Sequence, residues 1–384
     1  MNSDRPLKPI RSSRRKLRVG VVFGGRSGEH AVSLISAQSV MRAMNPAHYE
    51  VIPIGITKQG SWVVAGDVLQ FLQSGVGDVA PAALLADPAR QAVLELSQGQ
   101  ELETVLRSIS LDVVFPVLHG PLGEDGTIQG LLELANIPYV GAGVMASAVA
   151  MDKIVAKDIF AAHQFPIVRY LAIKRKSWEA APKAVIDQVE REIGYDCFIK
   201  PACLGSSVGI SKAHNRTELS AGLTMAARYD RKLLVEAAVP NAREIEVAVL
   251  GNDEPIASVA GEIIPCREFY DYRAKYIDDR SELLIPAPLS MSLSEQIRQL
   301  AVQAYLAVDC AGMARVDFLV ERDSERFYLS EINTIPGFTS ISMYPKLWEA
   351  SGIPYSELID RLIELALERH ADKNKSQTTF EPDW

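Results

Sequence analysis

Apolar and polar positions in the first third of the chain follow a strand, loop, helix order. Leu17–Phe23 is a continuous, β-branched apolar run, which is typical of a buried parallel strand. The same reading gives strands at Tyr49–Ile56 and Leu111–Leu118 and helices at Ala31–Met44 and Gly126–Ala135. The pattern predicts a doubly wound α/β domain whose ligand-binding loops, Gly24–His30 and His119–Gly126, follow the carboxyl ends of strands. Residues 64–105 show no clear period, and we predict no elements there.

A second unit with mixed strands and helices is predicted at about residues 142–236. Its helices are expected at Val144–His163, Ser177–Ile193 and Arg216–Tyr229, and its strands at Pro166–Ile173, Cys197–Lys200, Val208–Lys212 and Lys232–Ala237. From Arg243 the pattern becomes rich in strands, and we expect a third unit that ends in a helix at Ser351–His370. A polar loop, residues 265–282, interrupts that unit.

Composition limits the classes of function. The chain has 384 residues, which suits two or three domains at about 100–200 residues each. Its net charge of −8 argues against bulk binding of nucleic acid. The four cysteines have no C-x-x-C spacing, so a zinc site is not expected; they are Cys197, Cys203, Cys266 and Cys310. The chain shows neither a secretory signal nor about 20 consecutive apolar residues, which predicts a cytoplasmic protein that does not insert into membranes.

The stretch Ala314–Met343 holds the most specific chemistry. Two strand-like runs joined by a charged hairpin would bring Asp317, Glu331 and Asn333 together, and Arg315 would share the face of Asp317. Carboxylate and amide oxygens on stiff strands suit Mg²⁺, which binds through carboxylates and substrate phosphates. The alternative is a solvated acidic hairpin.

Two lysines are candidates for binding phosphate. Lys200 precedes the small-residue turn Gly205–Gly209, whose backbone N–H groups can form an anion nest. The turn can equally be an ordinary hairpin turn. Lys153, on a predicted helix, reads by itself as a surface lysine.

Each of the other polar residues can be interpreted in two ways, as a structural residue or as a ligand-binding residue. Glu236 and Glu244 suit either a junction salt bridge or contacts with an adenine amino group and ribose hydroxyls. Glu29 suits either a helix N-terminus, where a carboxylate is stabilised by the helix dipole, or a substrate ammonium group. His119 is either a turn residue or a polar group of the site. The aromatic loop FYDYRAKY, with Lys275 and Tyr276, suggests a lid that packs onto a ligand.

Taken together, these segments resemble the D-alanine–D-alanine ligase family of ATP-grasp enzymes. The resemblance extends from about Leu17 to Leu367, and it is carried by GGRSGEHAVSL, HGPLGEDGTIQGLLE, GVMASAVAMDK, IKPACLGSSVGISK, FYDYRAKY, ARVDF and EINTIPGFTSISM in this order. It implies an α/β (α+β) fold of the ATP-grasp type, in which an N-terminal domain precedes two α+β subdomains that clasp ATP. The expected parts are a disordered basic arm (1–16), the N-terminal domain (17–141), the central subdomain (142–236), the C-terminal subdomain (237–371) with its lid loop (265–282), and a polar tail (372–384).

The resemblance also implies the reaction and the residues that perform it. ATP would phosphorylate the carboxylate of one D-alanine, and the amine of a second would attack the acyl phosphate, as in the synthesis of peptidoglycan precursors. ATP would be held by Lys153, Lys200, Glu236, Glu244 and Lys275, and two Mg²⁺ ions, with Mn²⁺ as an alternative, by Asp317, Glu331 and Asn333. Arg315 and the backbone N–H of Gly337 would stabilise the oxyanion. The first D-alanine would be held by Glu29, with His119 as a further substrate-binding residue, and the second by Ser342 and Met343. Glu29, Ser206 and Tyr276 would lock the lid.

Three hypotheses follow from the resemblance. The first is a D-alanine–D-alanine ligase that acts on small molecules as a homodimer, without nucleic acid or membrane partners. The second is a ligase of the same fold that uses D-lactate or D-serine as the second substrate. The intact lid with Tyr276 favours D-alanine. The third is a regulatory nucleotide-binding module, which predicts the loss of Arg315 or a metal ligand, and none is missing.

Overall fold

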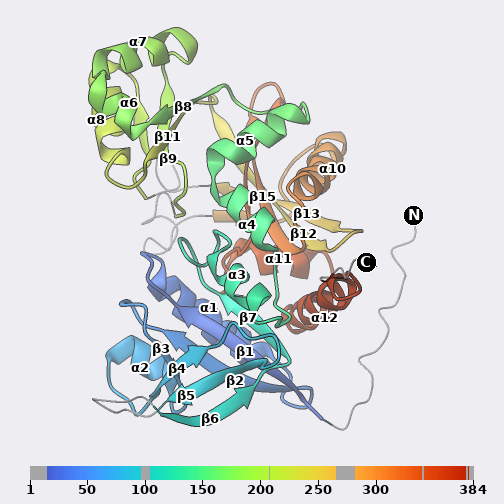
Figure 1. Ribbon diagram of the computed structural model, residues 1–384. Coiled ribbons are helices and arrows are strands. Elements are labelled where there is room, and N and C mark those ends of the chain that lie inside the picture. Colours follow the sequence, from blue (N-terminus) through green and yellow to red (C-terminus); the bar gives the residue numbers. More distant parts are fainter. Residues whose placement is uncertain are drawn as a thin grey trace, which may run out of the picture.

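Three β-sheets follow one another along the chain in a computed structural model that describes residues 15–96, 104–206, 208–264, 282–339, 341–377 and 379. Figure 1 shows the seven-stranded sheet at the bottom, the five-stranded sheet in the middle and the four-stranded sheet at the upper left. The predicted basic arm, up to residue 14, and almost all of the predicted lid loop lie outside the described residues. Arg15, which the prediction assigned to the arm, is bound to Asp112 through its guanidinium at 2.6 Å.

The N-terminal sheet has the strand order β6-β5-β4-β3-β2-β1-β7. Its strands are β1 (Leu17–Gly24), β2 (Tyr49–Ile56), β3 (Trp62–Val64), β4 (Ala80–Leu84), β5 (Ala92–Leu96), β6 (Val105–Ser110) and β7 (Val113–Val117). The predicted strands β2, β1 and β7 are parallel, whereas β3 to β6 add antiparallel neighbours where we had predicted no elements. The sheet is therefore mixed, and its parallel part is one edge.

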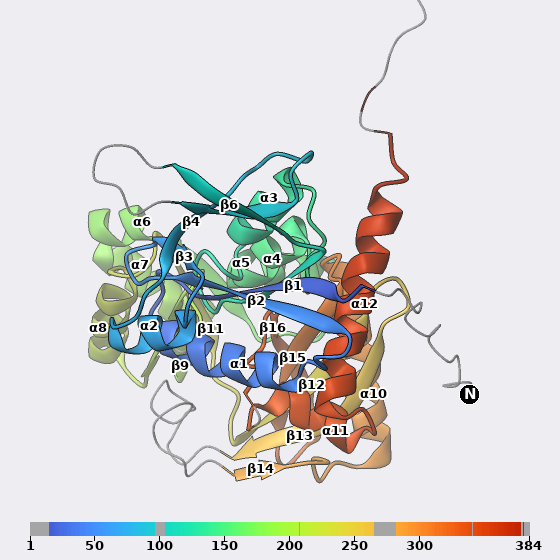
Figure 2. The same ribbon diagram turned by 90° about the horizontal axis from the view of Figure 1, so that it is seen from below.

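Helices cover both faces of the parallel part. They are α1 (His30–Ala43), α2 (Val68–Ser74) and α3 (Thr127–Leu134). Alternate residues of β1 point to opposite faces: Val21 packs with α1, and Val22 packs with α3. Figure 2, viewed from below, shows α1 and α3 on opposite sides of β1 and β2.

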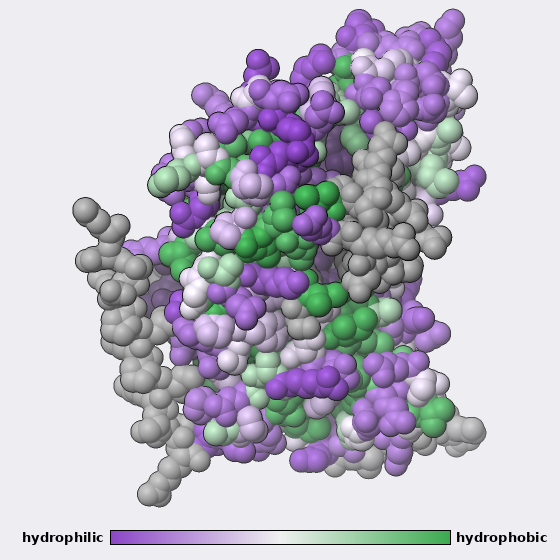
Figure 3. Space-filling model, turned by 180° about the vertical axis from the view of Figure 1, so that it is seen from behind, coloured by the Kyte–Doolittle hydropathy of each residue, from purple (hydrophilic) through white to green (hydrophobic). Residues whose placement is uncertain are grey.

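The central unit has a four-stranded sheet of order β10-β9-β11-β8. Its elements are α4 (Val144–Met151), α5 (Lys153–Ala162), β8 (Tyr170–Lys174), α6 (Arg175–Ala180), α7 (Pro182–Glu192), β9 (Cys197–Pro201), β10 (Ser211–Ala213), α8 (Arg216–Ala226) and β11 (Lys232–Ala237). On the face shown in Figure 3, the surface of this unit is mainly hydrophilic.

Two predicted helices are each divided into two. The helix predicted at 144–163 breaks at Asp152, whose side chain accepts from the backbone N–H groups of Ile154 and Val155 and so begins α5. The helix predicted at 177–193 breaks before Pro182, which stands at the first position of α7. The helical spacing of apolar residues continues through both breaks. The capping residue Asp152 and the proline Pro182 therefore set the helix boundaries.

The five-stranded sheet has the order β14-β13-β12-β15-β16. Its unit contains β12 (Ala242–Gly251), β13 (Ile256–Ile264), β14 (Glu282–Leu284), α10 (Met291–Ala307), β15 (Gly312–Glu321), β16 (Phe327–Asn333), α11 (Met343–Ala350) and α12 (Tyr355–Lys373). Helix α12 extends two residues into the predicted polar tail. Among the described residues, no helix is both long and apolar enough to cross a membrane.

One hydrophobic core joins the N-terminal sheet to the C-terminal helices. Buried residues of β1, β7 and α1 pack with those of α11 and α12 in a single cluster. The rings of Phe115 on β7 and Phe338 after β16 meet edge to face, with centroids 5.9 Å apart. This shared core holds the loops after β1, β7 and β16 next to one another.

Candidate active site

Three neighbouring strands of the five-stranded sheet place carboxylates opposite one another. The register pairs Glu246 on β12 with Asp317 on β15, and Asp317 with Glu331 on β16. Residues paired in this way share a face of the sheet, so the three acids form one row. Arg315 lies two residues before Asp317 and shares that face.

Arg315 is the cation at the centre of this row. Its Nε and Nη2 each donate to Asp317 at 2.7 Å, and Nε lies 3.1 Å from Oε2 of Glu246. Burial alone would lower the pKa of Arg315, but the charges of Asp317 and Glu246 outweigh burial and raise that pKa well above its ordinary value. Within the described part of the chain, the hydrogen bonds of the guanidinium are made by Nε and Nη2 and none by Nη1, and contact of Nη1 with a substrate stays a prediction.

The predicted metal ligands lie together in the same place. Asn333 Nδ2 donates to Asp317 Oδ2 at 2.9 Å, and Glu331 stands opposite Asp317. Among the described residues, no group of three or more His, Cys, Asp and Glu side chains is placed to hold a metal ion. Two carboxylates and one amide nevertheless fit a hard cation that takes its other ligands from phosphates and water. The alternative of a solvated hairpin is disfavoured because Asp317 is only 16% exposed.

Lys153 connects this row to the central unit. Its ammonium donates to the carbonyl of Leu204 at 2.8 Å and lies 3.4 Å from Oε2 of Glu331. Its backbone N–H donates to the carbonyl of Ala202. The side chain is 12% exposed, so Lys153 is not a free surface lysine. The Asp152 cap of α5 sets this position.

A second charged cluster lies within the central unit. The buried carboxylate of Glu236 on β11 lies 3.1 Å from Nζ of Lys157 and also pairs with Lys200 on β9. Burial alone would raise the pKa of Glu236, but the two ammonium groups outweigh burial and lower that pKa to about 2. Lys157 stands on α5, whose buried residues pack with the five-stranded sheet, so a salt bridge at the junction between units remains one reading of this contact. Contact of Glu236 with adenine stays a prediction.

The pKa of Lys200 is affected by acidic residues of both clusters. Burial lowers its pKa, whereas the charges of Glu236, Glu331 and Glu244 raise it, and the net shift is upward. The predicted ATP-binding residues Lys200, Glu236 and Glu244 are therefore neighbours of the predicted metal ligand Glu331.

Glu29 and Ser206 meet across two units. Glu29 stands at the N-cap of α1, yet its side chain makes no capping hydrogen bond. It accepts instead from the hydroxyl of Ser206 in the turn after β9. Ser206 has a φ of 50°, a left-handed conformation that is uncommon for residues other than glycine. A Cβ at Gly120 would lie 2.5 Å from the Glu29 carboxylate, so glycine is required at that close approach. The helix dipole alone does not account for Glu29.

His119 is buried at the carboxyl end of β7. Its Nδ1 lies 3.1 Å from the carbonyl of Ile335 and 3.5 Å from Glu124, and its Nε2 lies 3.2 Å from the hydroxyl of Ser36. Burial alone would lower the pKa of His119, but the hydrogen bond and charge of Glu124 raise it above its ordinary value. Both ring nitrogens have protein partners, so direct binding of substrate by His119 stays a prediction.

The turn after β16 holds the remaining predicted residues. Ser342 stands at the N-cap position of α11 without a side-chain capping bond, and its Oγ accepts from the N–H of Thr339 at 3.1 Å. A Cβ at Gly337 would lie 3.0 Å from that Oγ, so Gly337 and Ser342 are neighbours. Met343 begins α11 and its side chain is buried. Lys275 and Tyr276 lie outside the described residues.

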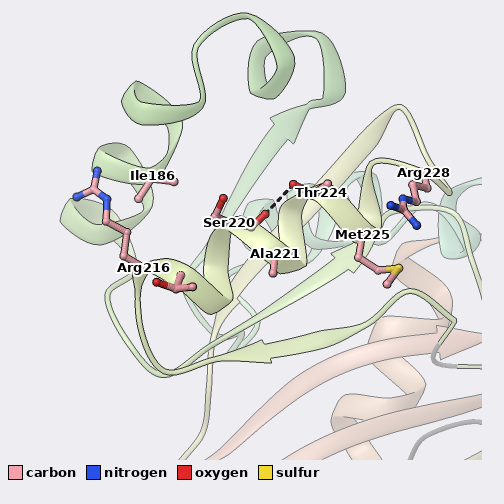
Figure 4. Close-up of a pocket in the computed structure, with 8 residues that line it drawn as sticks. Ile186, Arg216, Ser220, Ala221, Thr224, Met225 and Arg228 are labelled. Atoms are coloured by element: carbon pink, nitrogen blue, oxygen red, sulfur yellow. Dashed lines mark hydrogen bonds between the residues drawn. The ribbon is translucent and has the colours of Figure 1, made fainter.

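An open groove lies elsewhere on the described part of the chain. It encloses about 600 Å³ beside α7 and α8 and is lined by Ile186, Arg216, Thr217, Ser220, Ala221, Thr224, Met225 and Arg228. Figure 4 shows that its lining comes from these two helices and from Arg228, which follows α8, and no predicted site residue takes part. The groove is therefore separate from the charged clusters.

Four residues of the site were missed in the sequence. Glu246 lies two positions after Glu244 in a strand and so shares its face, which was a usable signal. Lys157 lies one helical turn after Lys153 in an otherwise apolar segment. Glu124 and Ser36 give no comparable signal, because their partners are distant in sequence.

The chain resembles known proteins in both sequence and fold. Residues 18–142 match the family model described as D-ala D-ala ligase N-terminus, and residues 159–364 match D-ala D-ala ligase C-terminus. A D-alanine--D-alanine ligase from Heliobacterium modesticaldum is 51% identical over 94% of this chain and 98% of its own length. Among solved structures, the D-alanine-D-alanine ligase from Coxiella burnetii has a TM-score of 0.77 at 38% identity, covering 94% of this chain and 96% of that one. The VanG D-Ala:D-Ser ligase from Enterococcus faecalis has a TM-score of 0.80 at 36% identity, covering 92% and 100%.

Proposed function

The chain belongs to the D-alanine–D-alanine ligase family, and we propose that its two charged clusters join two D-alanine molecules through a D-alanyl phosphate. The protein is an ATP-dependent ligase with the ATP-grasp fold, and its product is D-alanyl-D-alanine for peptidoglycan synthesis. One observation carries the assignment of the site. Lys153 contacts the negative cluster around Arg315 through Glu331, and a separate cluster places two ammonium groups around Glu236. These charges match the metal and the phosphates of a nucleotide.

In the first step, a carboxylate oxygen of D-alanine attacks the γ-phosphorus of ATP. A new P–O bond forms to the carboxylate, and the P–O bond to ADP breaks. Phosphoryl transfer depends on positioning and charge neutralisation more than on covalent chemistry with the protein. Lys153 and Lys200 supply positive charge, and Lys157 compensates part of the Glu236 charge so that Lys200 remains available to phosphate.

The metal would be held by Asp317, Glu331 and Asn333. We propose two Mg²⁺ ions, with Mn²⁺ as an alternative. When bound, they neutralise phosphate charge beside the transferred group. Glu246 then becomes the carboxylate that keeps Arg315 in place, because it contacts Nε independently of Asp317.

In the second step, the amine of the second D-alanine attacks the acyl carbon. A C–N bond forms, the C–O bond to phosphate breaks, and the amine loses a proton. Nη1 of Arg315 and the backbone N–H of Gly337 stabilise the oxyanion that develops at the acyl oxygen. Glu29 binds the ammonium group of the first D-alanine, and Ser342 and Met343 bind the carboxylate of the second.

Exclusion of water is the remaining requirement, because an acyl phosphate hydrolyses readily. The Glu29–Ser206 hydrogen bond already joins the N-terminal loop to the turn after β9. We propose that Tyr276 and Lys275 extend this contact, with Tyr276 completing the lock and Lys275 reaching the γ-phosphate.

A related activity, with D-serine as second substrate, is a second candidate because the Enterococcus faecalis D-Ala:D-Ser ligase has a similar structure. We expect D-alanine to be preferred. Product formation from D-alanine with D-alanine, D-serine or D-lactate as the competing second substrate decides between them. Preferential formation of the D-serine product would replace our assignment.

The function itself is tested by phosphate release. Purified protein with ATP, Mg²⁺ and D-alanine should release phosphate and form the dipeptide, whereas L-alanine should not substitute. Release no greater than with ATP alone would refute the function. We further propose that the enzyme is a cytoplasmic homodimer. Light scattering of the purified protein gives its molar mass and so tests whether it is a dimer.

A further inference from the structure

Two buried side chains of the N-terminal unit hold the turn that follows β16. The imidazole of His119 reaches the carbonyl of Ile335 at 3.1 Å. The hydroxyl oxygen of Ser36, on α1, accepts a hydrogen bond from the backbone N–H of Phe338 at 3.4 Å. Gly337 lies between these two anchored residues. The turn is therefore held at two points by a unit that is distant from it in sequence.

The hydrogen bonds have a fixed direction. The carbonyl of Ile335 can only accept, so Nδ1 of His119 carries a proton. In neutral His119, Nε2 then accepts from the Ser36 hydroxyl, 3.2 Å away. In protonated His119, Nε2 donates to Ser36. Ser36 can receive the N–H of Phe338 in both states, because its oxygen has two lone pairs.

These hydrogen bonds are buried, so water cannot replace a partner that is lost. Ser36 is fully buried and His119 is 4% exposed. Glu124 lies 3.5 Å from Nδ1, the same ring nitrogen that reaches Ile335. Phe338, itself buried, packs against Phe115, Tyr344 and Tyr355. A buried polar group that loses its partner has no water to replace it, so the loss of one bond weakens the whole chain.

We propose that Ser36 is a positioning residue for amide-bond formation, because its hydroxyl joins His119 to the Phe338 amide and so fixes the turn that carries Gly337. The proposal rests on the function above, in which the Gly337 N–H faces the oxyanion. Ser36 does not touch the substrate. It acts by keeping the donor in place, and misplacement of such a group by about 1 Å can cost about 100-fold in rate.

The test separates the two chemical steps. The reversible first step is followed by exchange of ¹⁸O between the bridging and non-bridging positions of labelled ATP in the presence of D-alanine. The second is followed by dipeptide formation. We expect Ser36→Ala to lower kcat for the dipeptide by about 10–100-fold, with the KM for ATP changed less than about twofold and isotope exchange largely retained.

Ser33→Ala is the matched control. Ser33 lies on the same face of α1, is equally buried, and bonds to Gly24 and Val117 instead of the turn. Both variants should lower Tm to a similar extent, but only Ser36→Ala should separate ligation from exchange. Ser36→Cys keeps nearly the same volume with a weaker hydrogen bond and should give a smaller loss of the same kind.

Several results would overturn the proposal. These are an unchanged kcat in Ser36→Ala, equal loss of exchange and ligation, or an equal loss of kcat in Ser33→Ala. Failure of both Ser36→Ala and Ser36→Cys to fold would assign Ser36 to stability alone. If the unaltered enzyme forms no dipeptide, the proposed function fails first.

Discussion

The two charged clusters of the site are opposite in composition. In one, the cation Arg315 lies among the carboxylates of Glu246 and Asp317, with Glu331 next in the row. In the other, the carboxylate of Glu236 lies between the ammonium groups of Lys157 and Lys200. Counting these side chains alone, the first cluster has three negative charges and one positive charge, and the second has two positive charges and one negative charge.

This difference in charge indicates where each part of a nucleotide can bind. Surplus negative charge accommodates a divalent cation, and surplus positive charge accommodates phosphate. Except for Lys157 on α5, the members of both clusters stand on strands, whose register fixes the spacing of their charges before a ligand arrives. Such preorganised charge stabilises a transition state without further reorganisation. Variants that remove charge from each cluster should therefore fail in different ways.

The largest effect is expected when the negative cluster loses its central cation. Arg315→Ala should lower kcat by about 10²–10³-fold, or about 3–4 kcal/mol, because a donor to the oxyanion is lost. ATP binding should weaken much less. Steady-state kinetics and equilibrium ATP binding measure the two effects. Arg315→Lys keeps the charge but not the planar fork that meets Asp317, and should recover little activity. Equal loss of kcat and ATP affinity would show that Arg315 acts in ground-state binding.

The positive cluster should make the free energy of unfolding depend on pH. The pKa of Glu236 lies at about 2, below its ordinary value of 4.5. Ionised Glu236 therefore stabilises the folded state above pH 4.5, and this contribution is lost as the pH falls from 4.5 towards 2. The shift corresponds to about 3 kcal/mol at neutral pH.

Urea unfolding of the unaltered protein and of Glu236→Gln, measured between pH 7 and pH 3, checks this expectation. The two free energies of unfolding should differ most at pH 7 and converge below pH 4.5. Other carboxylates titrate in both proteins and cancel in the difference. A difference that does not change with pH would mean that the two lysines do not depress the pKa of Glu236.

The sequence predicted the strands of both clusters well but not all of their members. Lys232–Ala237 was placed with correct bounds, because a continuous apolar run of this length has few alternatives. Arg315, Asp317, Glu331 and Asn333 were grouped correctly, because strand periodicity and one hairpin suffice to pair them. Their donor atoms alone predicted a Mg²⁺ site, whereas the number of ions and the substrate came from the resemblance. Their individual roles stay predictions.

What the sequence missed depends on partners that are distant along the chain. Glu246 meets Arg315 only because β12 pairs with β15, and Ser36 meets Phe338 only across the shared core. Strands β3 to β6 were missed for a different reason. They are short and lack the β-branched runs of β1 and β2, so neither helical nor strand periodicity dominates there. Asp152 divided a predicted helix because its capping bonds competed with continuing apolar spacing.

A smaller effect is expected at Lys153, whose ammonium lies next to Glu331 of the negative cluster. Lys153→Met removes the ammonium that contacts Leu204 and Glu331, so nucleotide binding should suffer more than chemistry. We expect the KM for ATP to rise by about 10-fold with kcat changed by less than about threefold. Lys176→Met, on the exposed surface of the same unit, is the control for loss of one positive charge. A large fall in kcat at unchanged KM would place Lys153 with Arg315 instead.

The smallest effect is expected at a cluster that repeats the composition of the Arg315 site on the surface. Arg216 pairs with Asp187 and, at 3.0 Å, with Glu190, so one arginine again lies between two carboxylates. Its side chain is 48% exposed, whereas that of Arg315 is 17% exposed. Water screens exposed charges and solvates them when a partner is removed. Arg216→Ala should therefore leave kcat within about twofold and Tm within about 2 °C of the unaltered enzyme. Because composition is matched, the contrast with Arg315→Ala isolates burial and position as the source of function. A loss comparable to that of Arg315→Ala would mean that the charges themselves, wherever they lie, determine activity.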